Sequence, residues 1–153
     1  MMTLCCKVLA QLTGKTLVTV ESLTGGGIGA AITAVPGSSA SYKGGIISYT
    51  NEVKHNILGV KTETLSEFGA VSAQTAAEMA AGARKLLSAD VAVSVTGLAG
   101  PGADEFGNPV GTVFIGYSDQ AKTTTAEYHF TGDRDSVRTQ TIQAALELIL
   151  RNL

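Results

Sequence analysis

The sequence has few of the residues that build disulfide scaffolds or metal sites. Cys5 and Cys6 are its only cysteines, and adjacent cysteines rarely have the geometry to bridge each other. This usage fits a reducing compartment, so we expect a cytoplasmic protein. His55 and His129 are the only histidines, and no carboxylates stand at ligand spacing from them, so the sequence predicts no metal site.

An excess of positive charge and long apolar runs are also missing. The chain has 11 Lys and Arg against 13 Asp and Glu, a net charge of −2. No global basic field is available for nucleic acid or an anionic membrane, so we expect neither as a partner. Segment 1–12 is fairly apolar, but it contains Lys7 and is too short to span a bilayer, so we interpret it as a packed helix. An anionic ligand must therefore be held by a local cluster.

Two common cofactor motifs are absent as well. The sequence has no Walker loop, and the glycines that follow Thr24 do not form the Gly-x-Gly-x-x-Gly pattern of a dinucleotide fold. No cofactor is therefore implied.

Apolar runs alternate with segments of helical spacing along the chain. We expect strands at 17–20, 45–49, 91–95, 110–118 and 123–130, and helices at 4–12, 23–34, 51–58, 62–68, 73–87 and 133–151. The last two strands are joined by a short polar turn, which is typical of an antiparallel hairpin. The pattern predicts one domain over residues 1–153 in the α/β class. Its architecture is a three-layer α/β/α sandwich with a mixed, mostly parallel sheet and a late antiparallel hairpin.

The first strand turns into a small-residue helix through Ser22, Thr24 and Gly25. The first N–H groups of a helix lack intrahelical partners, and the helix dipole adds positive potential there. Such a turn can stabilise a phosphate, a carboxylate or a developing oxyanion. The alternative is that the two hydroxyls only cap the helix, which is their commoner role.

Lys54 falls in the first turn of the helix expected at 51–58. The positive potential there disfavours the ammonium form and lowers the lysine pKa, so this residue could act as a base. The alternative is an ordinary surface lysine. Ser22, Tyr49 and Lys54 all follow the carboxyl ends of expected strands, the edge where α/β sheets build ligand sites. Together they allow a serine nucleophile, a lysine base and a tyrosine hydroxyl that orients a group or relays a proton.

Two loops contain further candidates for ligand binding. Ser39 follows Pro36 and Gly37 in a turn that could hold a ligand, although a simple helix stop explains it equally. Thr96 and Gly97 open a glycine-rich stretch that continues to Gly111. Glycines permit close backbone approach, and a loop of this length in a compact domain is more often functional than idle.

Arg134 and Arg138 stand four residues apart near the start of the last helix, hence on one face. Two such arginines can clamp a phosphate or a carboxylate. The alternative is surface pairing with the neighbouring aspartates, which stabilises little. Arg138 is expected to be the freer of the two.

Taken together, these segments resemble the C-terminal domain of the CinA family of competence/damage-inducible proteins, a domain also found alone as nicotinamide-nucleotide amidase. The resemblance covers nearly the whole chain. It rests on Glu-Ser-Leu-Thr-Gly-Gly at 21–26, Pro-Gly-Ser-Ser at 36–39, Tyr-Thr-Asn-Glu-Val-Lys at 49–54, Gly-Ala-Val-Ser at 69–72, Gly-Leu-Ala-Gly-Pro at 97–101, Pro-Val-Gly-Thr-Val at 109–113 and Gly-Asp-Arg at 132–134.

The resemblance implies hydrolysis of the carboxamide of nicotinamide mononucleotide (NMN) to nicotinate mononucleotide and ammonia, a step of pyridine nucleotide salvage that needs no metal or cofactor. It implies Ser22 as nucleophile, Lys54 as base and Tyr49 as assisting hydroxyl. The amides near Thr24 and Gly25 would stabilise the oxyanion. Residues implied for binding the nucleotide are Ser39, Thr96, Gly97 and the phosphate-binding Arg134 or Arg138. A small domain of this kind is expected to form a homodimer or a higher homo-oligomer.

The sequence departs from the family motif at Leu23, where the family has cysteine. If that cysteine only packs in the core, activity survives its replacement by leucine. If it contacts the nucleotide, the replacement lowers the affinity or the rate. The alternative function is therefore a catalytically weak nucleotide-binding or interaction domain of the same family.

Overall fold

The computed structural model describes residues 1–153 and contains one five-stranded sheet in the order β2-β1-β3-β4-β5. Strand β1 pairs in parallel with β2 and β3, while β3–β4 and β4–β5 are antiparallel. Only β4 runs against the other four strands, which confirms the mixed, mostly parallel sheet with a late hairpin. The strands are β1 (Leu17–Glu21), β2 (Tyr42–Ile47), β3 (Val91–Gly97), β4 (Thr112–Ser118) and β5 (Thr123–His129).

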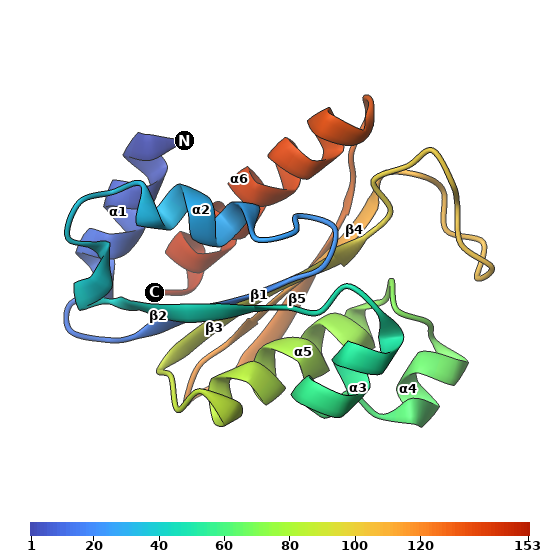
Figure 1. Cartoon of the computed structure of the whole chain (residues 1–153), viewed down its shortest axis with the longest axis horizontal. Helices are drawn as coiled ribbons and strands as arrows, with labels where there is room; N and C mark the ends of the chain where they lie inside the picture. The colour runs from blue at the N-terminus through green and yellow to red at the C-terminus, as the bar shows by residue number, and fades with distance from the viewer.

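Helices cover both faces of the sheet, so the predicted three layers are present (Figure 1). One face carries α1 (Met2–Leu12), α2 (Gly27–Thr33) and α6 (Arg134–Asn152). The other carries α3 (Asn51–Leu58), α4 (Thr62–Glu67) and α5 (Ala73–Leu86), and a short 3-10 helix (η1, Ser38–Ala40) leads into β2. None of the helices has the length and apolar character that crossing a bilayer requires.

The core lies on both sides of β1, β3 and β4. Side chains along β1 alternate, so that Leu17 packs beneath α1, α2 and α6 while Val18 and Val20 pack against α5. The same alternation continues along β3. Because both faces are covered, the sequences of the central strands are nearly continuous apolar runs. Each fully buried valine or leucine side chain contributes about 1.5–3 kcal/mol to the free energy of folding.

Two elements differ from their predicted bounds by more than two residues, and both differences change the backbone at the site edge of the sheet. The helix expected from residue 23 begins only at Gly27, because Gly25 and Gly26 have φ of +59° and +102° and form turns instead. The strand expected at 45–49 is Tyr42–Ile47, since its pairing with Leu17–Glu21 sets its length. These shifts leave Ser22 and Tyr49 in non-helical, non-strand backbone.

Helix α3, which carries Lys54, has the predicted bounds Asn51–Leu58. The Thr50 hydroxyl caps its first turn by accepting the Val53 N–H, and Gly59 closes it with φ of 75°. This short helix therefore begins directly after β2 and directs Lys54 back toward the end of β1.

Candidate active site

A cavity of about 670 Å³ opens at the carboxyl ends of β1 and β3. Five segments line it: the turn at Ser22, the stretch from Tyr49 to Lys54, residues 70–71 before α5, the end of β3 with the loop that follows it, and the start of α6 at Arg134. The cavity therefore occupies the sheet edge at which the sequence predicts the site.

Ser22 and Lys54 are in direct contact within this cavity. Lys54 is 1% exposed, and its Nζ lies 3.1 Å from Ser22 Oγ. The same nitrogen donates to the carbonyl oxygens of Ser48 at 2.7 Å and Tyr49 at 3.5 Å, and no carboxylate lies within ion-pairing distance. Burial lowers the pKa of Lys54 from 10.5 to about 8. The sequence predicts this direction, but the cause is burial, not the position in the first helical turn.

The first turn of α2 already holds an anion, which is the Glu21 side chain. Glu21 is 2% exposed. Its Oε1 accepts the N–H groups of Gly26 and Ile28 at 3.1 and 2.9 Å, and its Oε2 accepts the N–H of Gly29 at 3.0 Å. The Thr24 hydroxyl also donates to Oε1, at 2.7 Å, so it points away from the cavity. An external phosphate therefore has no free place at this helix terminus.

Backbone donors for an oxyanion remain in the turn that precedes α2. The Gly25 N–H is used, since it donates to the Ser22 carbonyl at 3.1 Å. The N–H groups of Leu23 and Thr24 donate to no other group of the chain. These two free donors directly follow Ser22, so they are candidates to stabilise an oxyanion formed by its attack.

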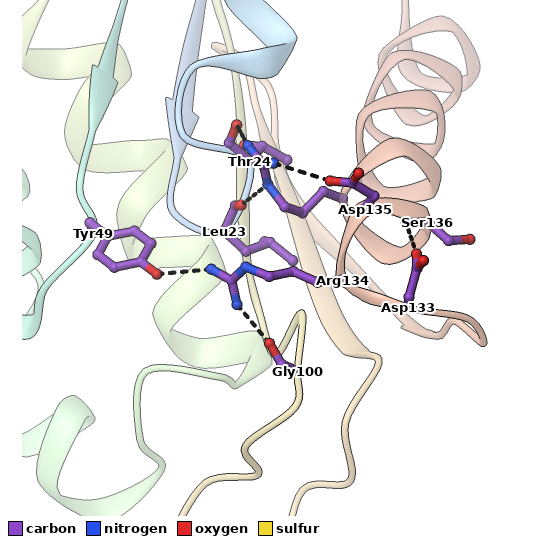
Figure 2. Close-up of polar contacts among 9 residues, drawn as sticks. Leu23, Thr24, Tyr49, Gly100, Asp133, Arg134, Asp135 and Ser136 are labelled. Atoms are coloured by element: carbon purple, nitrogen blue, oxygen red, sulfur yellow. Dashed lines mark hydrogen bonds and ion pairs between the residues drawn. The ribbon is translucent and has the colours of Figure 1, made fainter.

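The two arginines of α6 lie in different surroundings, and Figure 2 shows those of Arg134. Arg134 lines the cavity, where its Nη1 donates to the Gly100 carbonyl at 2.7 Å and its Nη2 to the Tyr49 hydroxyl at 3.3 Å. Arg138 does not line it. Arg138 Nε donates to the Leu23 carbonyl at 2.9 Å and Nη2 to the Thr24 carbonyl at 3.1 Å. The expectation that Arg138 is the freer arginine is wrong, because its guanidinium is bound to the backbone of the Ser22 turn.

The phenol of Tyr49 lies at the mouth of the cavity. Its side chain is largely exposed, with 57% of the residue accessible, and its hydroxyl contacts Arg134. No hydrogen bond joins that hydroxyl to Ser22 or Lys54. Tyr49 approaches Lys54 only through its backbone carbonyl.

The remaining binding candidates divide into two groups. Thr96 and Gly97 line the cavity at the end of β3. The Thr96 hydroxyl donates to the Ala70 carbonyl at 2.7 Å, and a Cβ on Gly97 would stand 2.7 Å from the Thr112 carbonyl oxygen, so both also have packing roles. Ser39 is exposed in η1, which leads into the amino end of β2, so within this chain it lies at the other end of the sheet.

The loop after β3 contributes residues that the sequence reasoning did not name. Asp104 Oδ1 accepts the N–H groups of Phe106 and Asn108 at 3.1 and 3.0 Å, and Asn108 Nδ2 donates to the Val71 carbonyl at 3.2 Å. Asp104 and Phe106 line the cavity. An aspartate in a glycine-rich loop is a recognisable turn signal, because its side chain can accept the backbone N–H two residues on. No three His, Cys, Asp or Glu side chains are grouped as a metal would need.

Comparisons with known proteins agree with this architecture. A family model described as CinA C-terminal domain matches residues 2–153. A CinA-like protein of Endomicrobium trichonymphae is 49% identical over 139 residues, and one of Geobacter metallireducens is 48% identical over 141 residues. These matches cover 91% and 92% of this chain but 32% and 34% of the relatives, so the chain spans about a third of their length.

Solved structures are similar over nearly the full chain. The competence damage-inducible protein A of Klebsiella pneumoniae aligns with a TM-score of 0.95 at 36% identity, covering 98% of this chain and 94% of that one. The competence/damage inducible protein CihA of Agrobacterium tumefaciens aligns with a TM-score of 0.94 at 39% identity, covering 98% and 93%.

Proposed function

Because this chain belongs to the CinA C-terminal domain family, we propose that it is an amidohydrolase that converts NMN to nicotinate mononucleotide and ammonia. The observation that carries the proposal is the 3.1 Å contact between Ser22 Oγ and Lys54 Nζ in a cavity open to solvent. A serine hydroxyl is a weak nucleophile until a neighbouring base takes its proton, and a buried lysine with a lowered pKa is such a base.

The contacts of Lys54 favour the direction of proton transfer that this reaction needs. A neutral lysine has two N–H bonds and one lone pair. With the N–H bonds directed at the carbonyls of Ser48 and Tyr49, the lone pair is left for the Ser22 hydroxyl. With a pKa of about 8, about a tenth of the molecules have a neutral Lys54 at pH 7.

The proposed sequence of steps conserves protons throughout. Ser22 Oγ attacks the carboxamide carbon while its proton passes to Lys54. The carbonyl oxygen becomes an oxyanion, which the free N–H groups of Leu23 and Thr24 stabilise. The Lys54 ammonium then protonates the departing nitrogen, which leaves as ammonia and yields a Ser22 ester of nicotinate mononucleotide.

Deacylation reverses these roles. Neutral Lys54 takes a proton from a water molecule that attacks the ester carbon, and the returned proton restores the Ser22 hydroxyl. Lys54 thus serves as base and acid in each half of the cycle.

Arg134 is the residue we assign to the substrate phosphate. Its guanidinium lies on the cavity wall with no carboxylate partner, and two of its nitrogens are oriented by Gly100 and Tyr49. Guanidinium groups bind phosphate by charge-assisted hydrogen bonds. In this assignment the Tyr49 hydroxyl orients Arg134, and the backbone carbonyl of Tyr49 orients Lys54.

Leu23 gives little support to the alternative of an inactive binding domain. Its side chain is buried and belongs to the main apolar core with Ile28 and Val95. Leu23 also lines the cavity, but Ser22 and Lys54 remain in contact beside it, so the leucine leaves the proposed catalytic pair in place.

The proposal is tested by incubating the purified protein with NMN and measuring ammonia and nicotinate mononucleotide. We expect turnover by the wild type and a loss of at least a thousandfold in Ser22→Ala and Lys54→Met, since nucleophile and base act as a unit. Lys61→Met, which changes an exposed lysine nearby, is the matched control and should retain full activity. Equal turnover by Ser22→Ala would overturn the mechanism.

A further inference from the structure

The backbone turn after Ser22 consists of three peptide units that are held in different ways. The carbonyl of Ser22 accepts the Gly25 N–H, which fixes the Ser22–Leu23 unit. The carbonyl of Thr24 accepts the Gly27 N–H as well as Arg138 Nη2, which fixes the Thr24–Gly25 unit twice over. The Leu23–Thr24 unit between them has one hydrogen bond to the rest of the chain, from Arg138 Nε to the Leu23 carbonyl at 2.9 Å.

That middle unit contains the free N–H of Thr24. In a trans peptide the C=O and N–H bonds point in opposite directions because the unit is planar. A guanidinium that holds the Leu23 carbonyl on one side therefore directs the Thr24 N–H to the other side. Without this hold, the unit has no intramolecular bond that prevents its rotation toward solvent.

We infer that Arg138 is a positioning residue that fixes the Thr24 N–H as an oxyanion donor for the Ser22–Lys54 pair. The inference rests on the proposed function, since an oxyanion arises only if Ser22 attacks a carbonyl carbon. It assigns different roles to the two arginines of α6: Arg134 would contact the ligand, whereas Arg138 would act on the backbone that stabilises the reacting atoms.

The surroundings of Arg138 support this division. Both of its bonds to the turn use adjacent donors of one planar group, which a lysine cannot reproduce because its ammonium is a single point. Its one ion-pair partner is Asp135, whose Oδ1 stands 3.9 Å from Nη1 and whose side chain is almost fully exposed, so that pair contributes little. The buried Glu21 carboxylate holds the following turn through Gly26, Ile28 and Gly29, so the motion of residues 22–25 is limited on the helix side as well.

The test compares Arg138→Lys and Arg138→Gln with the matched control Asp135→Asn, which removes the weak ion pair and leaves the two backbone contacts intact. Steady-state hydrolysis of NMN gives kcat and KM for each protein. Loss of one oxyanion donor costs roughly 100- to 1000-fold in kcat, so we expect a decrease in kcat of at least about tenfold in both Arg138 variants. KM should stay within about twofold, because Arg138 does not touch the substrate. Asp135→Asn should match the wild type.

A second readout uses pyridine-3-boronic acid, which requires no turnover. Addition of Ser22 Oγ to the trigonal boron, with transfer of the hydroxyl proton to Lys54, gives an anionic tetrahedral boronate, one of whose hydroxyl oxygens occupies the oxyanion position. Its formation is followed by ¹¹B NMR. We expect at least about tenfold weaker boronate binding by Arg138→Lys, at unchanged thermal stability, and no change by Asp135→Asn.

The outcomes distinguish failure of the proposed function from failure of the proposed role of Arg138. A wild type that neither hydrolyses NMN nor forms the boronate contradicts the proposed function itself, and with it the role of Arg138. An active wild type with Arg138 variants of unchanged kcat and boronate affinity overturns the positioning role alone. Variants with raised KM and normal kcat overturn it too, by making Arg138 a ligand contact.

Discussion

The carboxylate of Glu21 accepts the backbone N–H of Ile28 at 2.9 Å, so a residue at the end of β1 neutralises the first turn of the next helix. The seven-residue α2 has no side-chain cap of the usual kind at Gly26. Glu21 replaces that cap from the strand side and fixes the backbone on either side of Ser22.

Replacing Glu21 by glutamine should destabilise the fold. The amide keeps one acceptor oxygen, but its NH₂ group must then face either the Gly29 N–H or the donors around Oε1, and a donor facing a donor leaves both unpaired. We expect Glu21→Gln to lower the free energy of unfolding by about 2 kcal/mol in urea titrations at pH 7. The control is Glu63→Gln, an exposed residue in the first turn of α4, which should cost about 0.5 kcal/mol. Similar losses for both variants would contradict the role of Glu21.

The pH dependence of the rate follows from the pKa of Lys54. Burial lowers this pKa to about 8, and the mechanism needs the neutral amine, so kcat/KM should rise about tenfold per pH unit below 8 and level off above it. The second pKa of a phosphate monoester lies near 6, so substrate titration falls in a separate pH range. A profile with its midpoint near 10, or none between 7 and 9, would exclude Lys54 as the base.

The same pKa predicts a change of stability with pH. In the unfolded chain Lys54 has its ordinary pKa of 10.5, so between about pH 8 and 10.5 the unfolded state binds more protons than the folded state. The contribution of Lys54 to stability is therefore least favourable below pH 8 and improves as pH rises to 10.5. The difference between the two pKa values corresponds to about 3 kcal/mol.

This contribution must be measured as a difference between proteins. Burial raises the pKa values of Tyr42 and Tyr117, which act in the opposite sense as pH passes 10. We would measure urea unfolding of the wild type and of Lys54→Met at pH 7 and pH 9.5. The contributions of the two tyrosines are the same in both proteins and therefore cancel in the difference. The wild type should gain about 2 kcal/mol relative to the variant between these two pH values, and parallel pH profiles would contradict the burial of a titrating Lys54.

The sheet could be predicted because its central strands, such as 91–95, are buried on both faces and therefore appear as uninterrupted apolar runs. The approach of Ser22 to Lys54 could be predicted from their places after two neighbouring parallel strands, while their chemistry stays a proposal. Both inferences use short-range patterns together with one general rule of α/β topology.

The parts that escaped prediction depend on backbone atoms far along the chain. Arg138 binds carbonyls more than 100 residues earlier, and no side-chain pattern encodes a carbonyl that is free to accept. The start of α2 was placed too early because the left-handed turn at Gly25 and Gly26 competes with helix at the same residues. The turn after Pro36 and Gly37 and the motif resemblance both group Ser39 with the site, but its place before β2 separates it from the cavity within the chain.

Helix α5 approaches α3 at Gly82, where an added Cβ would stand 2.0 Å from the Leu58 carbonyl oxygen. Alanine normally stabilises a helix interior by about 1 kcal/mol relative to glycine. Here the clash with a backbone atom should reverse that sign, so we expect Gly82→Ala to destabilise the protein by about 1–3 kcal/mol. Because α3 carries Lys54, kcat should fall as well. Ala81→Gly on the exposed side of α5 is the control, with a loss of about 1 kcal/mol and normal kcat; a stabilised Gly82→Ala would contradict the close packing of the two helices.

If the proposed function holds, Arg134 should determine whether the protein distinguishes NMN from nicotinamide riboside, which lacks the phosphate. Its guanidinium lies on the cavity wall without a carboxylate partner, so a bound phosphate is its natural counterion. We expect Arg134→Met to raise KM for NMN by roughly tenfold or more while KM for the riboside stays unchanged, and Arg134→Lys to give an intermediate value. Arg134 also holds the Gly100 carbonyl, so a loosened loop after β3 is the competing explanation. A loosened loop would weaken both substrates equally, and a rise in KM of the same size for the riboside would therefore remove Arg134 from the phosphate site.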